Sequence, residues 1–188
     1  MKKSSELLLH QAAGAGNLNE FQRIESMQKE EFDINWNDNK HGCTYLMAGS
    51  YNGHMNVVTY LVEKGAIVDK KNMYGCRALS YAFLNNHLDV ARLLLERGAD
   101  PNVRPYDTNK FCCPIFFALV NEPEACELLL KFGANLDQKA SNGMTPLQIA
   151  IIKKTPKLLR YCKQQLIRKR KRKGRRLLRI LRRLRVMK

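Results

Sequence analysis

The residue types that could do chemistry lie in three places: an acidic, amide-rich turn, six scattered cysteines and a basic C-terminal end. The turn Asp33–Asp38 has oxygen ligands at alternate positions, as a calcium-binding loop does. Thr44 stands where such a loop needs its acidic twelfth residue, so we expect no calcium site. The sequence also lacks a nucleophile–base–orienter set and a phosphate-binding glycine loop. We therefore expect no enzyme, no catalytic residues and no cofactor.

The cysteines do not have the spacing of a zinc site, because no Cys-x-x-Cys pair is matched by a second one. They are Cys43, Cys76, Cys112, Cys113, Cys126 and Cys162. No apolar run reaches the roughly 20 residues of a membrane-spanning helix, and Leu7–Leu9 is too brief for a signal-peptide core. We expect an intracellular protein in which the cysteines are free thiols.

The basic residues gather at the C-terminal end. Residues 1–137 hold 14 Lys and Arg against 17 Asp and Glu, whereas residues 138–188 hold 19 Lys and Arg and no acid. The densest cluster is Arg168, Lys169, Arg170, Lys171, Arg172, Lys173, Arg175 and Arg176. Such a run is typical of a nuclear-localisation signal read by an importin-type receptor. It could also bind nucleic-acid phosphates without sequence preference, since no aromatic residue is present to stack on bases.

The last part of this basic tail has a second pattern. Apolar residues of the segment 175–188 recur at helical spacing between arginines; they are Leu177, Ile180, Leu181, Leu184 and Met187. An amphipathic basic helix of this kind suits an anionic membrane surface or an acidic partner. A solvated, disordered tail is the remaining alternative. We favour localisation, and expect the protein in the nucleus or the cytoplasm.

The secondary-structure elements that position these residues are predicted from a sequence segment that recurs along the chain. Thr44–Met47, Arg77–Ser80, Cys113–Phe116 and Thr145–Gln148 open blocks that are 33, 36 and 32 residues apart. The first three blocks each continue into an apolar helical stretch and a Gly-Ala pair. A period near 33 residues predicts a solenoid whose units stack on a shared core.

One block shows the design of a unit. Gly75 suits a tight turn, and Leu79 and Ala82 have the spacing of a short first helix. After a break at His87, a second apolar stripe runs to Gly98, which suits a helix C-cap. Helices shorter than about 12–15 residues are marginal alone, so the neighbouring units must stabilise each other.

These motifs resemble those of ankyrin-repeat proteins. The family's Gly-x-Thr-Pro-Leu-His-x-Ala opening is matched by Gly143–Ala150, its Gly-His-x-x-Val-Val by Gly53–Val58, and its Leu-Leu-x-x-Gly-Ala-Asp-x-Asn by Leu94–Asn102. A weaker first copy begins at Leu7. The resemblance implies an all-α solenoid of stacked helix-turn-helix units with short β-turn or hairpin tips.

The resemblance covers about residues 5–162 and divides the chain into a repeat domain, 1–162, and a basic tail, 163–188. We place five units at about 5–38, 39–71, 72–107, 108–139 and 140–162. The loop Arg104–Phe111 is longer than the family's, and Phe111 replaces the usual turn glycine. We expect the stack to be least regular there.

In this family the turn tips and the inner faces of the first helices line a concave groove that binds a protein. The matching positions are Lys40, His41, Tyr51, Asn52, Met73, Tyr74, Leu84, Asn85, Asn109 and Lys110. His54 and His87 are instead expected to bond turn backbone between units. We predict a monomeric, non-catalytic adaptor or inhibitor that grips one protein partner. The alternative is a nucleic-acid- or membrane-associated protein anchored by its tail.

Overall fold

The computed structural model describes residues 2–28, 32–102, 123–135, 137, 143–145, 148 and 167. The helices in these residues are α1 (Lys2–Gly14), α2 (Leu18–Met27), α3 (Tyr45–Tyr51), α4 (Met55–Glu63), α5 (Ala78–Leu84), α6 (Leu88–Glu96) and α8 (Pro123–Lys131). Within this part, β-structure is limited to one antiparallel bridge between Asn37 and Thr44. The prediction of an all-α repeat solenoid is confirmed.

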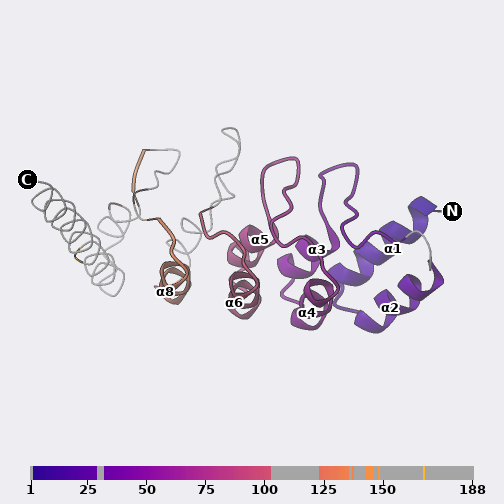
Figure 1. The fold of residues 1–188 in the computed structure, drawn as a ribbon. Coiled ribbons are helices and arrows are strands. Elements are labelled where there is room, and N and C mark those ends of the chain that lie inside the picture. Colours follow the sequence, from indigo (N-terminus) through magenta and orange to yellow (C-terminus); the bar gives the residue numbers. More distant parts are fainter. Residues whose placement is uncertain are drawn as a thin grey trace, which may run out of the picture.

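The helices form two rows (Figure 1). The first helices of the units, α1, α3 and α5, lie in one row, and α2, α4, α6 and α8 lie in the other. Helix α3 packs against both α1 and α5, and α4 packs against α6. The loops that precede α3 and α5 project from the side of the first row (Figure 1). No helix in the described part is long and apolar enough to cross a membrane.

Side chains at the helix starts explain where the helices begin. The Oδ1 atom of Asn17 accepts a hydrogen bond of 3.0 Å from the Glu20 N–H and so caps α2. The Oγ1 atom of Thr44 accepts one of 3.2 Å from the Met47 N–H and caps α3. Each cap satisfies a backbone donor that has no partner inside the helix.

One buried apolar cluster extends from α1 to α8 and joins the units. Its largest side chains include Leu9, Phe21, Leu46, Leu61, Phe83, Leu94 and Leu129. Ala13 of α1 and Ala82 of α5 are also fully buried in this cluster. The residues predicted from helical spacing, including Leu79 and Ala82, lie in this core.

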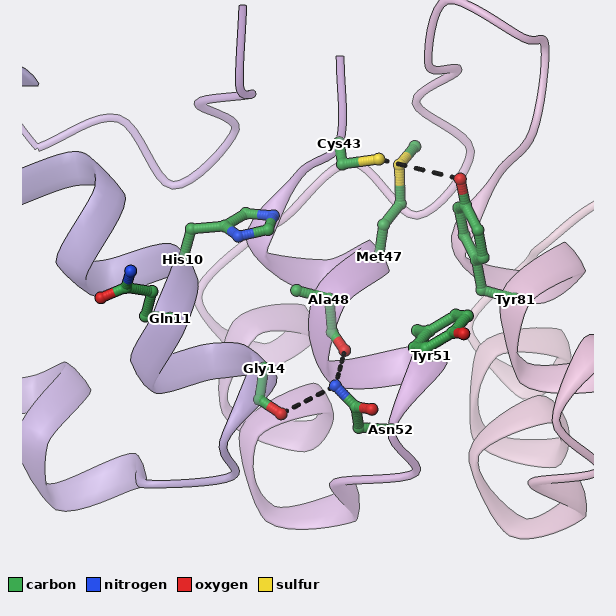
Figure 2. Close-up of a pocket in the computed structure, with 9 residues that line it drawn as sticks. All are labelled: His10, Gln11, Gly14, Cys43, Met47, Ala48, Tyr51, Asn52 and Tyr81. Atoms are coloured by element: carbon green, nitrogen blue, oxygen red, sulfur yellow. Dashed lines mark hydrogen bonds between the residues drawn. The ribbon is translucent and has the colours of Figure 1, made fainter. Parts of the chain in front are cut away.

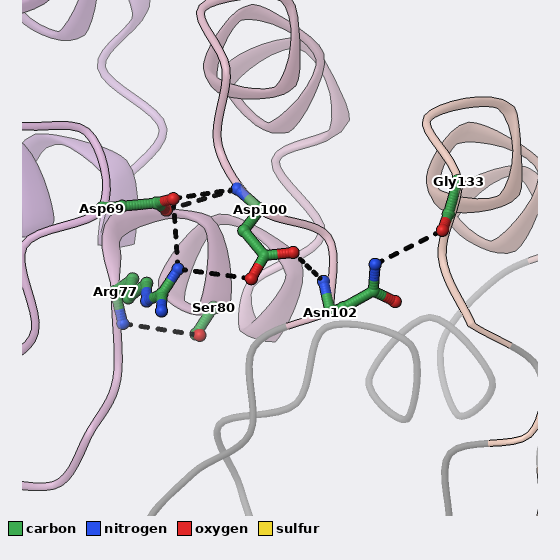
Figure 3. Close-up of polar contacts among 6 residues, drawn as sticks. All are labelled: Asp69, Arg77, Ser80, Asp100, Asn102 and Gly133. Carbon is green, nitrogen blue, oxygen red and sulfur yellow. Dashed lines mark hydrogen bonds and ion pairs between the residues drawn. The ribbon is translucent and has the colours of Figure 1, made fainter.

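Polar side chains also join successive units where the chain leaves the second helices, after α4, α6 and α8 (Figure 3). The Asp69 carboxylate accepts a hydrogen bond from the Asp100 N–H at 3.1 Å. The Arg77 guanidinium lies 3.1 Å from the Asp69 carboxylate and 3.7 Å from that of Asp100. The Asn102 amide then donates to the Gly133 carbonyl oxygen at 3.3 Å, which continues the chain of contacts towards α8.

Two histidines also join the units. The Nε2 atom of His54 lies 2.9 Å from the Gly14 carbonyl oxygen, and that of His87 lies 3.1 Å from the Tyr51 carbonyl oxygen. Each imidazole therefore bonds the backbone at the end of the preceding unit's first helix. The expected structural role of His54 and His87 is confirmed.

The cysteines partly depart from expectation. Cys43 and Cys126 form no disulfide bond, but Cys76 is disulfide-bonded, so the expectation that every cysteine is a thiol is wrong for Cys76. The loop Arg104–Phe111 and the predicted helix at 175–188 lie outside the described residues. The boundaries of the fourth and fifth units and of the tail remain predictions.

Candidate functional site

A pocket of about 310 Å³ lies between the first helices of the first three units (Figure 2). Helix α1 contributes one wall through His10, Gln11 and Gly14. These residues are spaced by three and four positions, so they share one face of α1. Leu9 and Ala13, on another face, point into the core.

Helix α3 forms the floor. Met47, Ala48, Tyr51 and Asn52 line the pocket and again repeat at helical spacing. The Asn52 amide nitrogen donates to the Gly14 carbonyl oxygen at 2.8 Å, which fixes this side chain between α1 and α3 (Figure 2).

The opposite wall comes from Tyr81 of α5 and from Cys43, which precedes α3. The Tyr51 and Tyr81 rings meet edge to face, with centroids 5.8 Å apart. The Asn72 amide donates to the Tyr81 hydroxyl at 2.8 Å, and the Cys43 sulfur lies 3.7 Å from the same hydroxyl. This wall is therefore held in place by bonds between the second and third units.

The pocket is electrically neutral at neutral pH. None of its lining residues is Lys, Arg, Asp or Glu. Burial raises the pKa of the Cys43 thiol, although hydrogen bonds with Tyr81 and Asn72 oppose the shift. Burial likewise raises the pKa of Tyr81 and lowers that of His10, so each group stays uncharged. A protonated thiol is a poor nucleophile, so this lining is suited to contact rather than to covalent chemistry.

The tips of the second unit (Asp38–Gly42) and of the third unit (Asn72–Gly75) bond to each other. The Met73 N–H donates to the His41 carbonyl oxygen at 3.0 Å, and the His41 Nδ1 atom lies 3.0 Å from the Tyr74 hydroxyl. The side chains of Met73 and Tyr74 nevertheless remain 61% and 43% exposed. The two tips thus form one connected edge that presents apolar surface.

The structure brings together part of the predicted site. Tyr51 and Asn52 line the pocket, and Lys40 is exposed on the second tip. Leu84 is exposed at the end of α5, beside Asn85, whose amide donates to the Tyr51 carbonyl oxygen. Predicted residues outside the described part are Asn109, Lys110, Arg168, Lys169, Arg170, Lys171, Arg172, Lys173, Arg175 and Arg176.

Several lining residues were not among those predicted from the sequence; they are His10, Gln11, Gly14, Cys43, Met47, Ala48 and Tyr81. Helical spacing could have predicted some of them, because Met47 and Ala48 lie one helical turn before the predicted residues Tyr51 and Asn52 and therefore share their helix face. Tyr81 similarly lies three residues before Leu84. Among the described residues, no group of three or more His, Cys, Asp or Glu is placed to hold a metal ion.

Comparison with known families agrees with this architecture. The family model for ankyrin repeats (3 copies) matches residues 9–105, which is just over half of the 188 residues. The chain belongs to the ankyrin-repeat family. Domains of this family are protein–protein interaction modules and are typically non-catalytic. A comparison with curated proteins gave no match.

Proposed function

We propose that this protein is a non-catalytic adaptor or inhibitor that binds one protein partner in its groove. By groove we mean the pocket, the second and third tips and the exposed end of α5. The main support for this proposal is that bulky apolar and aromatic side chains are exposed around a pocket lined by uncharged residues: Tyr51 is 44% exposed and Leu84 is 38% exposed. Aromatic and apolar side chains without charge are typical of the centre of a protein interface.

We propose separately that the basic run at 168–176 directs the protein to the nucleus through an importin-type receptor. Its support is compositional: 19 Lys and Arg and no acid from residue 138 onwards. The same composition supports the alternative, in which the tail anchors the protein to nucleic acid or to an anionic membrane.

Affinity capture from cell extract, followed by mass spectrometry, tests the groove. The bait is the full-length protein, compared with Tyr51→Ala/Leu84→Ala and with Met27→Ala. Met27 is a matched control, since it is 69% exposed on α2, in the other helix row. We expect a protein retained by wild type and Met27→Ala but lost with the double variant. If everything captured is retained equally by all three baits, the groove is not the binding site.

A fluorescent fusion tests the tail. Residues 168–173, all Lys or Arg, are changed together to Gln and the distribution is compared with wild type. Loss of nuclear accumulation is the expected result. Release from a membrane or from chromatin would support the anchoring alternative, and an unchanged distribution would reject both roles.

A further inference from the structure

We infer that the pocket between α1, α3 and α5 takes a basic side chain, arginine in preference to lysine, from a segment of the partner protein. This rests on the proposed function and adds the chemistry of the partner. The inference follows from the apolar walls of the pocket, from its two aromatic rings and from one carboxylate whose charge acts on its lining.

The size and walls of the pocket suit a long side chain with an apolar stem. Its volume of about 310 Å³ is at the lower end of the roughly 300–1,000 Å³ typical of small-ligand sites. Met47 and Ala48 contribute carbon surface to it, and none of the lining residues that the structure describes is a Lys or Arg that would repel a cation. The methylene groups of a basic residue can pack against such walls while its charged end stays near water.

Two tyrosine rings offer a surface for the cation. Tyr51 and Tyr81 both line the pocket and meet edge to face, with ring centroids 5.8 Å apart (Figure 2). Tyr51 is 44% exposed, so part of this residue is open to a ligand. A guanidinium group stacks on aromatic rings and is more weakly hydrated than an ammonium group. It therefore loses less on leaving water, which favours arginine over lysine.

The Asp38 carboxylate supplies the opposite charge. Its Oδ2 atom accepts a hydrogen bond of 3.0 Å from the backbone N–H of Cys43, which lines the pocket. Burial lowers the pKa of the His10 imidazole and Asp38 opposes this shift, whereas burial raises the pKa of the Cys43 thiol and Asp38 adds to the rise. The charge of Asp38 thus reaches two walls of the pocket. A negative potential there favours a cation and repels an acidic side chain.

Asp38 is ionised and has room for a further donor. Burial raises its pKa, but hydrogen bonds from the backbone N–H groups of His41, Cys43 and Lys40 outweigh this effect and hold the pKa below its ordinary value. Two of these bonds go to Oδ1 and one goes to Oδ2. A carboxylate has about four acceptor sites, so Oδ2 can accept another hydrogen bond. An apolar side chain would fill the pocket but gain nothing from this carboxylate.

The chain's own tail is the competing basic occupant, since residues 163–188 contain no acid. A tail that reached the groove would be present at an effective concentration of roughly millimolar, whereas the proposed function needs a groove that is open to a partner. The run 168–173 also consists only of Lys and Arg, while the groove exposes the apolar side chains of Met73 and Leu84. A partner segment with one basic residue among apolar or uncharged residues fits these features better.

Peptide display can identify the preferred segment without a known partner. A random 12-residue library is selected on the full-length protein in about 0.3 M salt, which shortens the reach of the charges on the tail. Each round is counter-selected on full-length Ala48→Phe, whose new ring fills the pocket. Peptides that bind elsewhere on both proteins are thereby removed. We expect the survivors to share one arginine or lysine among apolar or uncharged residues.

Fluorescence anisotropy then compares labelled peptides that differ only at this basic residue. Citrulline keeps the shape of arginine without its charge, and norleucine replaces the residue by an unbranched apolar chain. Each replacement should weaken binding to the full-length protein by roughly threefold to tenfold, because the attraction to Asp38 and to the tyrosine rings is lost. Citrulline or norleucine peptides that bind as tightly as the basic peptide would overturn the inference.

A variant of the carboxylate tests which group attracts the cation. Asp38→Asn should weaken the arginine peptide to about the affinity of the citrulline peptide, which should bind wild type and Asp38→Asn alike. Glu96→Gln removes the same charge from an exposed position of α6 and is the control, so it should leave both affinities unchanged. Circular dichroism verifies that each variant is folded. If Asp38→Asn is not folded, the citrulline and norleucine peptides on the wild-type protein decide the question.

The remaining outcomes separate this inference from the proposed function. Survivors that are acidic, or apolar without a basic residue, would overturn the inference and leave binding in the groove intact. A synthetic peptide of residues 163–188 that displaces a survivor as well as the unlabelled survivor does would assign the pocket to the chain's own tail, against this inference. If no peptide distinguishes wild type from folded Ala48→Phe, the proposed function of the groove fails as well.

Discussion

The ring of His87 occupies the space that a side chain at Gly53 would need. Gly53 has a positive φ of 76°, and a Cβ atom built on it would collide with the His87 imidazole. The Nε2 atom of the same ring bonds the Tyr51 carbonyl oxygen at 3.1 Å. Gly53 and His87 together therefore determine how closely the third unit stacks on the second.

Gly53→Ala should destabilise the protein more than Gly65→Ala. Both glycines have positive φ, which costs an alanine roughly 1–2 kcal/mol. Only at Gly53 must the new methyl group also displace His87 and break its bond to Tyr51, because Gly65 has no other atom within 4 Å of such a group. We expect an additional loss of about 1–2 kcal/mol in the free energy of unfolding, measured by urea denaturation. Equal losses would contradict this account of the unit interface.

Much of this arrangement could be predicted from the sequence. The period near 33 residues indicated the stacking, and His54 and His87, at equivalent positions of their units, were expected to bond turn backbone between units. Both follow from local patterns that recur in each unit. The core likewise followed from helical spacing, as at Leu79 and Leu94, which are buried.

The lining of the pocket was harder to predict, because it depends on how neighbouring units are rotated against each other. Tyr81 lines the pocket, and its hydroxyl accepts a hydrogen bond from the Asn72 amide in the loop before α5. His10 faces it because the first unit, the weakest copy of the repeat, still packs its helix beside α3. Neither contact leaves a signal in the repeat motif itself.

Tyr81→Phe should reduce stability where Tyr51→Phe does not. The Tyr81 hydroxyl accepts the Asn72 amide at 2.8 Å in a half-buried site, whereas no described residue bonds the Tyr51 hydroxyl. Removing the Tyr81 hydroxyl leaves a partly buried donor poorly satisfied, at a cost of about 1 kcal/mol. Tyr51→Phe should stay within about 0.5 kcal/mol of wild type in the same urea titration. A larger loss of unfolding free energy for Tyr51→Phe than for Tyr81→Phe would contradict the claim that the hydrogen bond between Asn72 and Tyr81 holds this wall of the pocket in place.

Arg77→Met should cost more than Arg23→Met. The Arg77 side chain is mostly buried, and its guanidinium bridges Asp69 and Asp100. Its removal leaves two carboxylates close together, which predicts a loss of about 1–3 kcal/mol. Arg23 makes an exposed pair with Glu20 one helical turn away, and solvent screens such a pair, so its loss should have little effect on stability. Urea denaturation of the two variants measures the difference, and a similar loss for both would rule out a bridging role for Arg77.

His10 should make stability depend on pH near neutrality. Its ring lies in a half-buried site beside Trp36 and Tyr45, with ring centroids 6.1 and 6.4 Å away. Burial lowers its pKa below the ordinary 6.5, although Asp38 opposes the shift. The unfolded chain therefore binds a proton before the folded chain does. Stability from this group is fully present above pH 6.5 and is lost as the pH falls through the lowered pKa.

The comparison with His10→Gln isolates this effect, because the other histidines are the same in both proteins. Between pH 7.5 and 5, the urea midpoint of wild type should fall further than that of His10→Gln, which cannot titrate at this position. The direction follows from linkage, since the unfolded state binds more protons over that interval. Parallel curves would show that His10 is no less easily protonated in the folded protein than in the unfolded chain. A steeper fall for His10→Gln would reverse the sign and place a stabilising charge, rather than a neutral ring, in the wall of the pocket.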